Sequence, residues 1–291
     1  MQIVIVSGYR FDYDKSIKNI ICSSLSDIGY QYQYINYNKN EKEKSLDTIG
    51  KITKEQSDCV ILICVPKNIP DIIKNIQNNN IILWNQESIS KTAEYKNIIN
   101  NAATNNNVKN IWLYNECQFS YIKSKKAKFV PMGFHGNLCV SKNKKIIFNK
   151  LLFIGGIREN RRKYFNKLNE HDIAIDCSDD YRLGPGDKLE QYQFGIDVDE
   201  YPEQSEKYRW HRLMLYASNN IIFFSTTNWE KYGFVNGSHY INFKNISELK
   251  TKYLRLRERE HIVNNIVCNM SEKVRKDYNM SDILKYNLLN L

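Results

Sequence analysis

The chain of 291 residues carries 42 Lys and Arg against 32 Asp and Glu, a formal net charge of +10, and 42% of its residues are hydrophobic. This composition is that of a globular protein and excludes disordered and collagen-like chains. The length allows one large domain or two ordinary ones. There is no run of 18 apolar residues and no signal-peptide pattern at the start, so we expect no transmembrane segment.

The excess positive charge lies in one half of the chain. Residues 1–150 carry 21 basic and 12 acidic side chains, whereas residues 151–291 carry 21 and 20. Arg10 is the only Arg of the first half, and the second half has ten. Codon usage of an AT-rich genome is one explanation of the Lys excess, but it does not explain why ten Arg lie in one half.

The seven Cys form no CxxC pair, which predicts a reducing compartment without a disulfide framework or a zinc site. We therefore expect the protein in the cytoplasm, which would be the host cytoplasm if the source is viral. A peripheral association with a membrane is left open.

Short apolar runs alternate with helical patterns through the first half of the chain. Strands are expected at 3–7, 30–37, 60–65, 81–84, 110–114 and 128–130. Helices are expected at 16–28, 69–76, 91–101 and 116–123, and a charged loop at 39–44. Apolar strands that alternate with helices predict βαβ units and a parallel sheet.

A second series of this kind follows a polar, Lys-rich stretch that we interpret as a linker. Strands are expected at 151–154, 173–176, 194–198, 221–225 and 240–243. Helices are expected at 159–168, at 206–217 and from 247 onward, with one break near 269–271. The fold class is thus α/β, with an N-terminal domain over 1–140, a C-terminal domain over 141–270, and a helix over 271–291 that could cross back to the N-terminal domain.

The strongest candidate site follows the first strand of the second domain. Gly155 and Gly156 lead from this strand into a helix start that carries Arg158, Arg161 and Arg162. Glycine lets a backbone approach a ligand closely, and the N–H groups of a helix start favour an anion. Arginine adds planar, bidentate donors for phosphate. The pattern predicts a diphosphate cradle, although a tight turn with solvated Arg would look similar.

A second candidate is the helix expected at 206–217. Arg209 and Arg212 are three residues apart, which predicts that they share one helix face. This helix starts at the carboxyl end of a strand, where open α/β sheets bind ligands. Either Arg could instead be an ordinary surface cation.

Three side chains compete for the role of general base. Glu87 and Asp14 each follow a predicted strand, as does Asp12, and His135 lies where the first domain ends. A carboxylate or imidazole in such a position can take a proton from an acceptor hydroxyl. A helix N-terminal acid and a plain loop His are equally good explanations of these residues.

Several motifs resemble, in order, those of bacterial and viral GT-B glycosyltransferases. They are Ile82–Glu87, Ile111–Asn115, Phe129–His135, and Phe153–Gly156 followed by Arg161-Arg162. The stretch 194–243 is also similar to the donor-domain end of the CAP10-like family. The resemblance implies two Rossmann-like domains that face a cleft, with a sugar nucleotide on the C-terminal domain and the acceptor mainly on the N-terminal one.

The resemblance also implies roles for individual residues. Gly155, Gly156, Arg158, Arg161 and Arg162 would approach the donor diphosphate. Arg212, with Ser205 or His211 nearby, would make a second contact with the diphosphate. Arg209 lies close to these residues in sequence and is a further candidate for donor binding. Many GT-B enzymes hold the donor ribose with a Glu, but Met214 occupies that position in this chain, so the ribose contact is left without a candidate.

We expect no metal requirement. Asp197 and Asp199 match an Asp-x-Asp motif in spacing, but Asp197 ends an apolar strand of the second domain. The metal-binding form of this motif belongs to a different, single-domain fold. Arg can offset the charge of a leaving nucleoside diphosphate without a metal ion.

The sequence therefore predicts a glycosyltransferase that moves a sugar from a nucleoside-diphosphate sugar to a hydroxyl of a glycan, protein or lipid. The Lys-rich first half suggests an acidic acceptor. Two alternatives are left open. One is a DNA-modifying glycosyltransferase with nucleic acid as a partner, and the other is a non-catalytic nucleotide- or glycan-binding module of the same fold.

Overall fold

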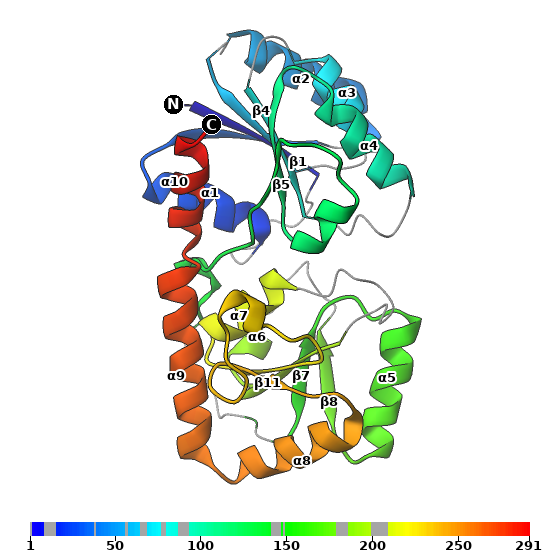
Figure 1. Cartoon of the computed structure of the whole chain (residues 1–291), viewed down its shortest axis with the longest axis vertical. Coiled ribbons are helices and arrows are strands. Elements are labelled where there is room, and N and C mark those ends of the chain that lie inside the picture. Colours follow the sequence, from blue (N-terminus) through cyan, green and yellow to red (C-terminus); the bar gives the residue numbers. More distant parts are fainter. Residues whose placement is uncertain are drawn as a thin grey trace. The chain divides into compact units, whose positions relative to one another are not determined.

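The computed structural model describes residues 2–8, 16–37, 39–55, 58–64, 69–76, 80–86, 93–140, 147, 149–178, 186–198 and 209–291. The chain divides into two compact units, each described by itself (Figure 1). Unit 1 comprises Met1–Phe11, Ile21–Pro131 and Ser281–Leu291, and unit 2 comprises Asp12–Ile20 and Met132–Met280. Within the described ranges, no helix is both long and apolar enough to cross a membrane.

Unit 1 is built on a six-stranded sheet with the order β2-β1-β3-β4-β5-β6, in which all neighbouring strands are parallel. The strands are β1 (Gln2–Ser7), β2 (Gln31–Asn36), β3 (Val60–Ile63), β4 (Asn80–Asn85), β5 (Val108–Leu113) and β6 (Ala127–Phe129). The helices are α1 (Ile17–Asp27), α2 (Lys42–Glu55), α3 (Ile69–Lys74), α4 (Ala93–Ala103) and α10 (Met280–Leu289). Of α1 and α10, the residues from Ile21 and from Ser281 onward belong to this unit.

Helices cover both faces of this sheet, which explains why its inner strands are apolar without alternation. Ile49 of α2, Ile72 of α3 and Ile99 of α4 pack into one core cluster with the strands. Figure 1 shows α1 and α10 side by side on the other face. The Ser281 hydroxyl lies 3.2 Å from a carboxylate oxygen of Asp27, at the end of α1. The last helix of the chain thus belongs to unit 1.

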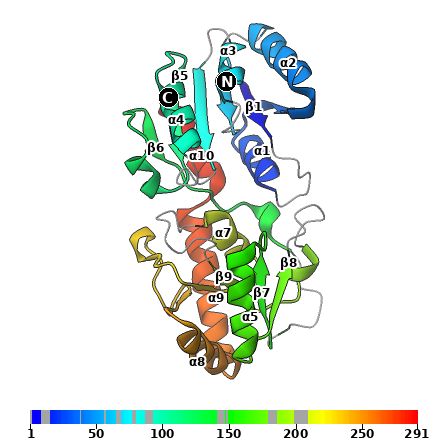
Figure 2. The ribbon, with the colours of Figure 1, turned by 90° about the vertical axis from the view of Figure 1, so that its right-hand side faces the viewer.

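Unit 2 has a five-stranded parallel sheet with the order β11-β10-β9-β7-β8. The strands are β7 (Leu151–Ile154), β8 (Ile175–Ser178), β9 (Phe194–Asp197), β10 (Ile222–Ser225) and β11 (Ile241–Asn242). The helices are α5 (Glu159–Glu170), α6 (Gly186–Leu189), α7 (Trp210–Ser218), α8 (Ile246–Arg257) and α9 (Glu260–Asp277). Figure 2 shows β7 and β8 side by side in this unit. The expected α/β fold of two parallel-sheet domains is confirmed.

Aromatic contacts identify the layers of unit 2. Phe165 of α5 packs on Phe153 of β7, with ring centroids 4.9 Å apart. Tyr253 of α8 packs on Phe194 of β9 at 5.3 Å. Phe153 and Phe194 point to the same face, because Leu152 and Gly195 are register partners. The opposite face is covered by α7. The sheet therefore lies between α5 and α8 on one side and α7 on the other.

Two local expectations are wrong. The charged loop expected at 39–44 is a short 3-10 helix, Lys39–Glu41, followed by α2, which buries a narrow stripe of Ser45, Ile49 and Thr53. Because this stripe has only one large apolar residue, the lysines around it hide the helical pattern.

The helix break expected near 269–271 is also absent, because α9 runs through to Asp277. The Asn269 amide donates to the Ser238 hydroxyl, and the Ser271 hydroxyl accepts from Arg275. These side chains are therefore engaged and do not compete for the helix backbone. The chain instead leaves the helix at 258–259 and 278–279.

Candidate functional site

The strand order of unit 2 reverses between β7 and β9. From β7 the chain continues to β8 on one side of the sheet and then to β9 on the other. Open α/β sheets bind ligands beyond the carboxyl ends of the strands at such a reversal. Here these ends are Ile154, followed by Gly155 and Gly156, and Asp197, followed by Val198. The first predicted candidate site thus lies at the switch point.

The two glycines form an open turn. Gly155 has φ +152° and donates its N–H to the carbonyl of Ser178 at 2.9 Å. A Cβ on Gly156 would meet no atom within 4 Å. The turn therefore leaves free space over its backbone, where a ligand can approach.

Two helices begin at this edge of the sheet, α5 after β7 and α7 after β9. Their N-cap residues are Arg158 and Arg209, and neither side chain caps its helix. An arginine has no hydrogen-bond acceptor, so it cannot bind the N–H groups of the first turn. At both helix starts, N–H groups that no N-cap side chain binds lie beside a cation, a combination that favours an anion. Arg162 is exposed in the first turn of α5.

Arg161 faces inward and binds backbone groups of the protein. It is 6% exposed. Its Nε donates to the carbonyl of Val198 at 3.2 Å and an Nη to the carbonyl of Gly156 at 2.7 Å. Its guanidinium carbon lies 5.1 Å from the centre of the Phe153 ring. Arg161 thus ties the turn after β7 to the end of β9.

Arg212 is engaged in the same way from α7. Its Nε donates to the carbonyl of Ile154 at 2.8 Å, and it forms a buried ion pair with Asp197. Its guanidinium carbon lies 4.5 Å from the centre of the Phe153 ring. Arg161 and Arg212 therefore meet at one phenylalanine, so the two helix starts are neighbours.

The second predicted candidate site differs in one respect from the expectation. Helix α7 begins at Trp210, and Arg209 before it has a non-helical backbone with φ −109° and ψ 68°. Arg209 and Arg212 therefore do not share a helix face. Ser205 lies outside the described residues.

His211, in the first turn of α7, is partly buried. Burial lowers the pKa of His211 to about 4, so the imidazole is neutral at physiological pH. Its Nδ1 is buried without a hydrogen-bond partner in the described chain and can accept a hydrogen bond from a hydroxyl group. Met214, at the position of the ribose-binding Glu, is fully buried in the core.

Of the predicted bases, Glu87 and Asp14 lie outside the described residues, as does Asp12. His135 is 9% exposed and caps the short 3-10 helix Gly136–Leu138, where its Nδ1 accepts from the N–H of Asn137 at 3.1 Å. Neutral His135 in this arrangement carries its proton on Nε2 and is a donor there.

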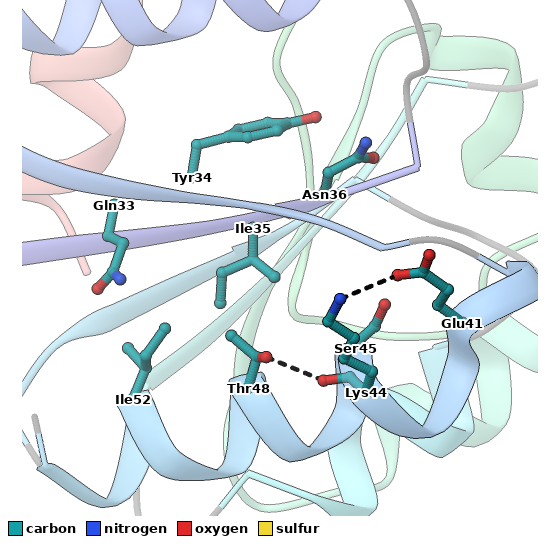
Figure 3. Close-up of a pocket in the computed structure, with 9 residues that line it drawn as sticks. All are labelled: Gln33, Tyr34, Ile35, Asn36, Glu41, Lys44, Ser45, Thr48 and Ile52. Carbon is teal, nitrogen blue, oxygen red and sulfur yellow. Dashed lines mark hydrogen bonds and ion pairs between the residues drawn. The ribbon is translucent and has the colours of Figure 1, made fainter.

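Unit 1 has a pocket of about 360 Å³ between β2 and α2. Figure 3 shows Gln33 pointing from β2 to the side of α2 that carries Thr48. Ser45 also lines the pocket. The two charged residues of the pocket, Glu41 and Lys44, form an ion pair with 3.5 Å between the Lys44 Nζ and a carboxylate oxygen of Glu41. Amides, hydroxyls and a neutralised ion pair suit a hydroxyl-bearing molecule and not a diphosphate. None of the predicted site residues lies in this pocket.

Across the described part of the chain, no three His, Cys, Asp or Glu side chains gather as a metal site. Asp197, the formal first residue of the Asp-x-Asp motif, has Arg212 as its counter-ion. Asp199 lies outside the described residues.

Three residues at this edge of the sheet had no role in the sequence-based prediction: Gly195, Tyr216 and, as an ion-pair partner, Asp197. A signal for Gly195 does exist. A glycine inside an apolar strand often marks a place where another group comes close. Nothing in the sequence signals that Tyr216 is that group.

Comparisons with known proteins bear on the fold. No family model and no curated protein sequence matches this chain. Similar solved structures include an α-glucosyltransferase in complex with UDP and a 13-mer DNA, at TM-score 0.67 and 9% identity, over 100% of this chain and 99% of that one. HepE of Anabaena with UDP-glucose matches at TM-score 0.65 and 10% identity, over 100% of both chains.

Sucrose-phosphate synthase of Thermosynechococcus elongatus matches at TM-score 0.63 and 9% identity, over 100% of this chain and 98% of that one. These likenesses confirm the predicted GT-B fold. The predicted likeness to the CAP10-like family is not confirmed.

Proposed function

We propose that this chain is a glycosyltransferase that transfers a sugar from a nucleoside-diphosphate sugar to an acceptor hydroxyl. One observation carries the proposal. The starts of α5 and α7 adjoin each other at the switch point of unit 2, beside the open Gly155–Gly156 turn. The proposal is also supported by the GT-B fold, since solved structures with this fold bind UDP or UDP-glucose.

The residues at this site suit a leaving diphosphate. When the glycosidic bond to the nucleotide breaks, negative charge develops on the β-phosphate oxygens. Preorganised N–H groups and cations stabilise this charge. We assign this role to the N–H groups of both helix starts and to Arg158, Arg162 and Arg209. Arg161 and Arg212, whose guanidinium groups already hold backbone carbonyls, shape the site from within.

His211 fits a role beside the diphosphate. Because it is neutral and its buried Nδ1 has no partner in the described chain, it offers an acceptor to a hydroxyl of the nucleotide ribose. This would replace the Glu that many GT-B enzymes use. Met214 is too deeply buried to do so.

A hydroxyl-rich acceptor such as a glycan is supported by the neutral pocket of unit 1. Two lysines of α2 are no evidence for an acidic acceptor. Lys42 pairs with Asp71 and Lys51 pairs with Asp47, each at 2.7 Å. Their charges are therefore already offset.

A second candidate function is the modification of DNA, which a different set of lysines favours. Lys123, Lys125 and Lys128 lie in and before the edge strand β6, and none has an ion-pair partner among the residues that the structure describes. Unpaired lysines at the rim of a domain suit contacts with phosphates of nucleic acid.

The test is a thermal-shift screen with UDP, GDP, CDP and their sugars, followed by a nucleoside-diphosphate release assay. A nucleotide that binds only the native state raises the melting temperature. We expect at least one nucleotide to do so and its sugar to be turned over. Failure of the whole panel in both assays would rule out both glycosyltransferase functions. Turnover that rises on addition of DNA would select the second.

A further inference from the structure

We infer that Tyr216, seated on Gly195, is a positioning residue that holds the carboxyl ends of β7 and β9 apart and so opens the crevice for the diphosphate. This inference rests on the proposed function, because it concerns the site that would bind the donor. It assigns a role to two residues that contact no phosphate themselves.

The hydrogen-bond ladder between β7 and β9 stops early. These strands pair only at Leu152 and Gly195 within the described chain, whereas β7 and β8 pair at four positions. If the ladder continued, the N–H and the carbonyl of Ile154 would be the next groups of β7 to bond with β9. The N–H of Ile154 instead donates to the Tyr216 hydroxyl at 3.2 Å, and its carbonyl accepts from Arg212 at 2.8 Å.

The Tyr216 hydroxyl also donates to the carbonyl of Leu152 at 2.8 Å. One hydroxyl thus binds the carbonyl of Leu152, the residue that pairs with β9, and the N–H of Ile154, which lies beyond the pairing. Burial of the Ile154 N–H without a partner strand therefore carries no penalty. Tyr216 and Arg212 are one helical turn apart on α7. Together, the side chains of Tyr216 and Arg212 bind the backbone groups of Ile154 that β9 would otherwise bind, and they lie where the two strands separate.

Gly195 makes room for this arrangement. A Cβ at Gly195 would lie 2.6 to 2.9 Å from three atoms of the Tyr216 ring. Any other residue would therefore push the ring, and α7 with it, away from the sheet. The absence of a side chain at Gly195 and the presence of the Tyr216 ring are therefore both needed for this packing contact.

The contact between Tyr216 and Gly195 bears on the site because it sets the position of α7. The start of α7 and the Gly155–Gly156 turn lie on either side of the separated strand ends. The distance between the N–H groups of the helix start and those of the turn therefore depends on how Tyr216 packs on Gly195. Oxyanion stabilisation is sensitive to such distances, since donors must lie within hydrogen-bond range of the developing charge.

The test compares Tyr216→Phe with Tyr192→Phe. The Tyr192 hydroxyl bonds to Asp176 and is also buried, but it lies before β9, at the amino edge of the sheet, away from the site. For each protein, the melting temperature is measured by circular dichroism. The Kd is measured by calorimetry for the nucleoside diphosphate that shifts the wild-type melting temperature most. Gly195→Ala is a second variant that moves the ring without removing the hydroxyl.

We expect Tyr216→Phe to raise the nucleotide Kd about tenfold, because Ile154 and Leu152 lose their common partner. We expect Tyr192→Phe to lower the melting temperature and leave the Kd within about twofold of wild type, since it loses a bond away from the site. An unchanged Kd in Tyr216→Phe, or an equal rise in both variants, would overturn the positioning role. If the wild-type protein binds no nucleoside diphosphate, the proposed function fails, and the inference fails with it.

Discussion

Removing the Arg212 side chain should destabilise unit 2 far more than removing an exposed arginine. Asp197 is 1% exposed and Arg212 is 8% exposed, so the pair is buried. In Arg212→Met, the Asp197 carboxylate stays buried without its counter-ion, and the carbonyl of Ile154 loses its donor. Breaking a buried ion pair by removing one partner costs about 3–5 kcal/mol.

This cost translates into a large change of melting temperature. For a domain of this size, each kcal/mol corresponds to about 2–4 °C. Arg212→Met should therefore lower the melting temperature of unit 2 by about 10 °C, measured by differential scanning calorimetry. Arg255→Met is the matched control, because Arg255 is exposed on α8 and forms no ion pair among the described residues.

A double variant tests the electrostatic reasoning directly. Asp197→Asn removes the charge that Arg212→Met leaves unpaired, so the double variant should regain much of the lost stability. Two results would refute the argument. One is a loss below about 1 kcal/mol in Arg212→Met, and the other is a double variant as unstable as the sum of its single variants. Any loss of nucleotide affinity in Arg212→Met would then be an indirect effect.

Three further predictions concern the site. Arg158→Ala and Arg162→Ala should each weaken nucleotide binding by about 1–2 kcal/mol, and less so at high salt. Calorimetry would contradict this if neither Kd changed, or if the control Arg255→Ala raised the Kd as much. The pKa of His211 is about 4 in the folded state, below the ordinary value of 6.5. As pH falls from 6.5 to 4, the unfolded state takes up the proton first, so up to about 3 kcal/mol of stability should be lost. Urea unfolding of His211→Gln should show a shallower pH dependence in this window, and an identical slope would refute the assignment. Because Asp197 already has a counter-ion, we expect sugar transfer to persist in EDTA. Activity that returns only on addition of Mg²⁺ or Mn²⁺ would contradict this.

The architecture could be predicted because parallel sheets leave a strong local signal. Strands buried on both faces are continuous apolar runs, such as Val60–Ile63 and Leu151–Ile154, and helices with a broad apolar stripe separate them. Helix α2 escaped prediction because Ile49 is the only large apolar residue of its buried stripe. Local pattern thus sufficed where burial is broad and failed where it is narrow.

The place of the candidate site could likewise be predicted. Which of its arginines are buried and which are exposed could not. The Gly155–Gly156 turn and the helix start after it are local features, readable from adjacent residues. Arg161 and Arg162 are neighbours in sequence, yet one is buried against backbone carbonyls and the other is exposed. Only the packing of α5 on the sheet decides which one faces inward.

The sequence by itself determined two α/β domains, a turn suited to an anion and a cluster of cations beside it. The tertiary structure alone decided which residues meet: Arg212 with Asp197, and Tyr216 with Gly195. The physical reason is that these pairs lie 15 and 21 residues apart in the chain, on separate elements. No local propensity links such residues. Their contacts follow from the strand order and from the packing of α7 over the separated ends of β7 and β9.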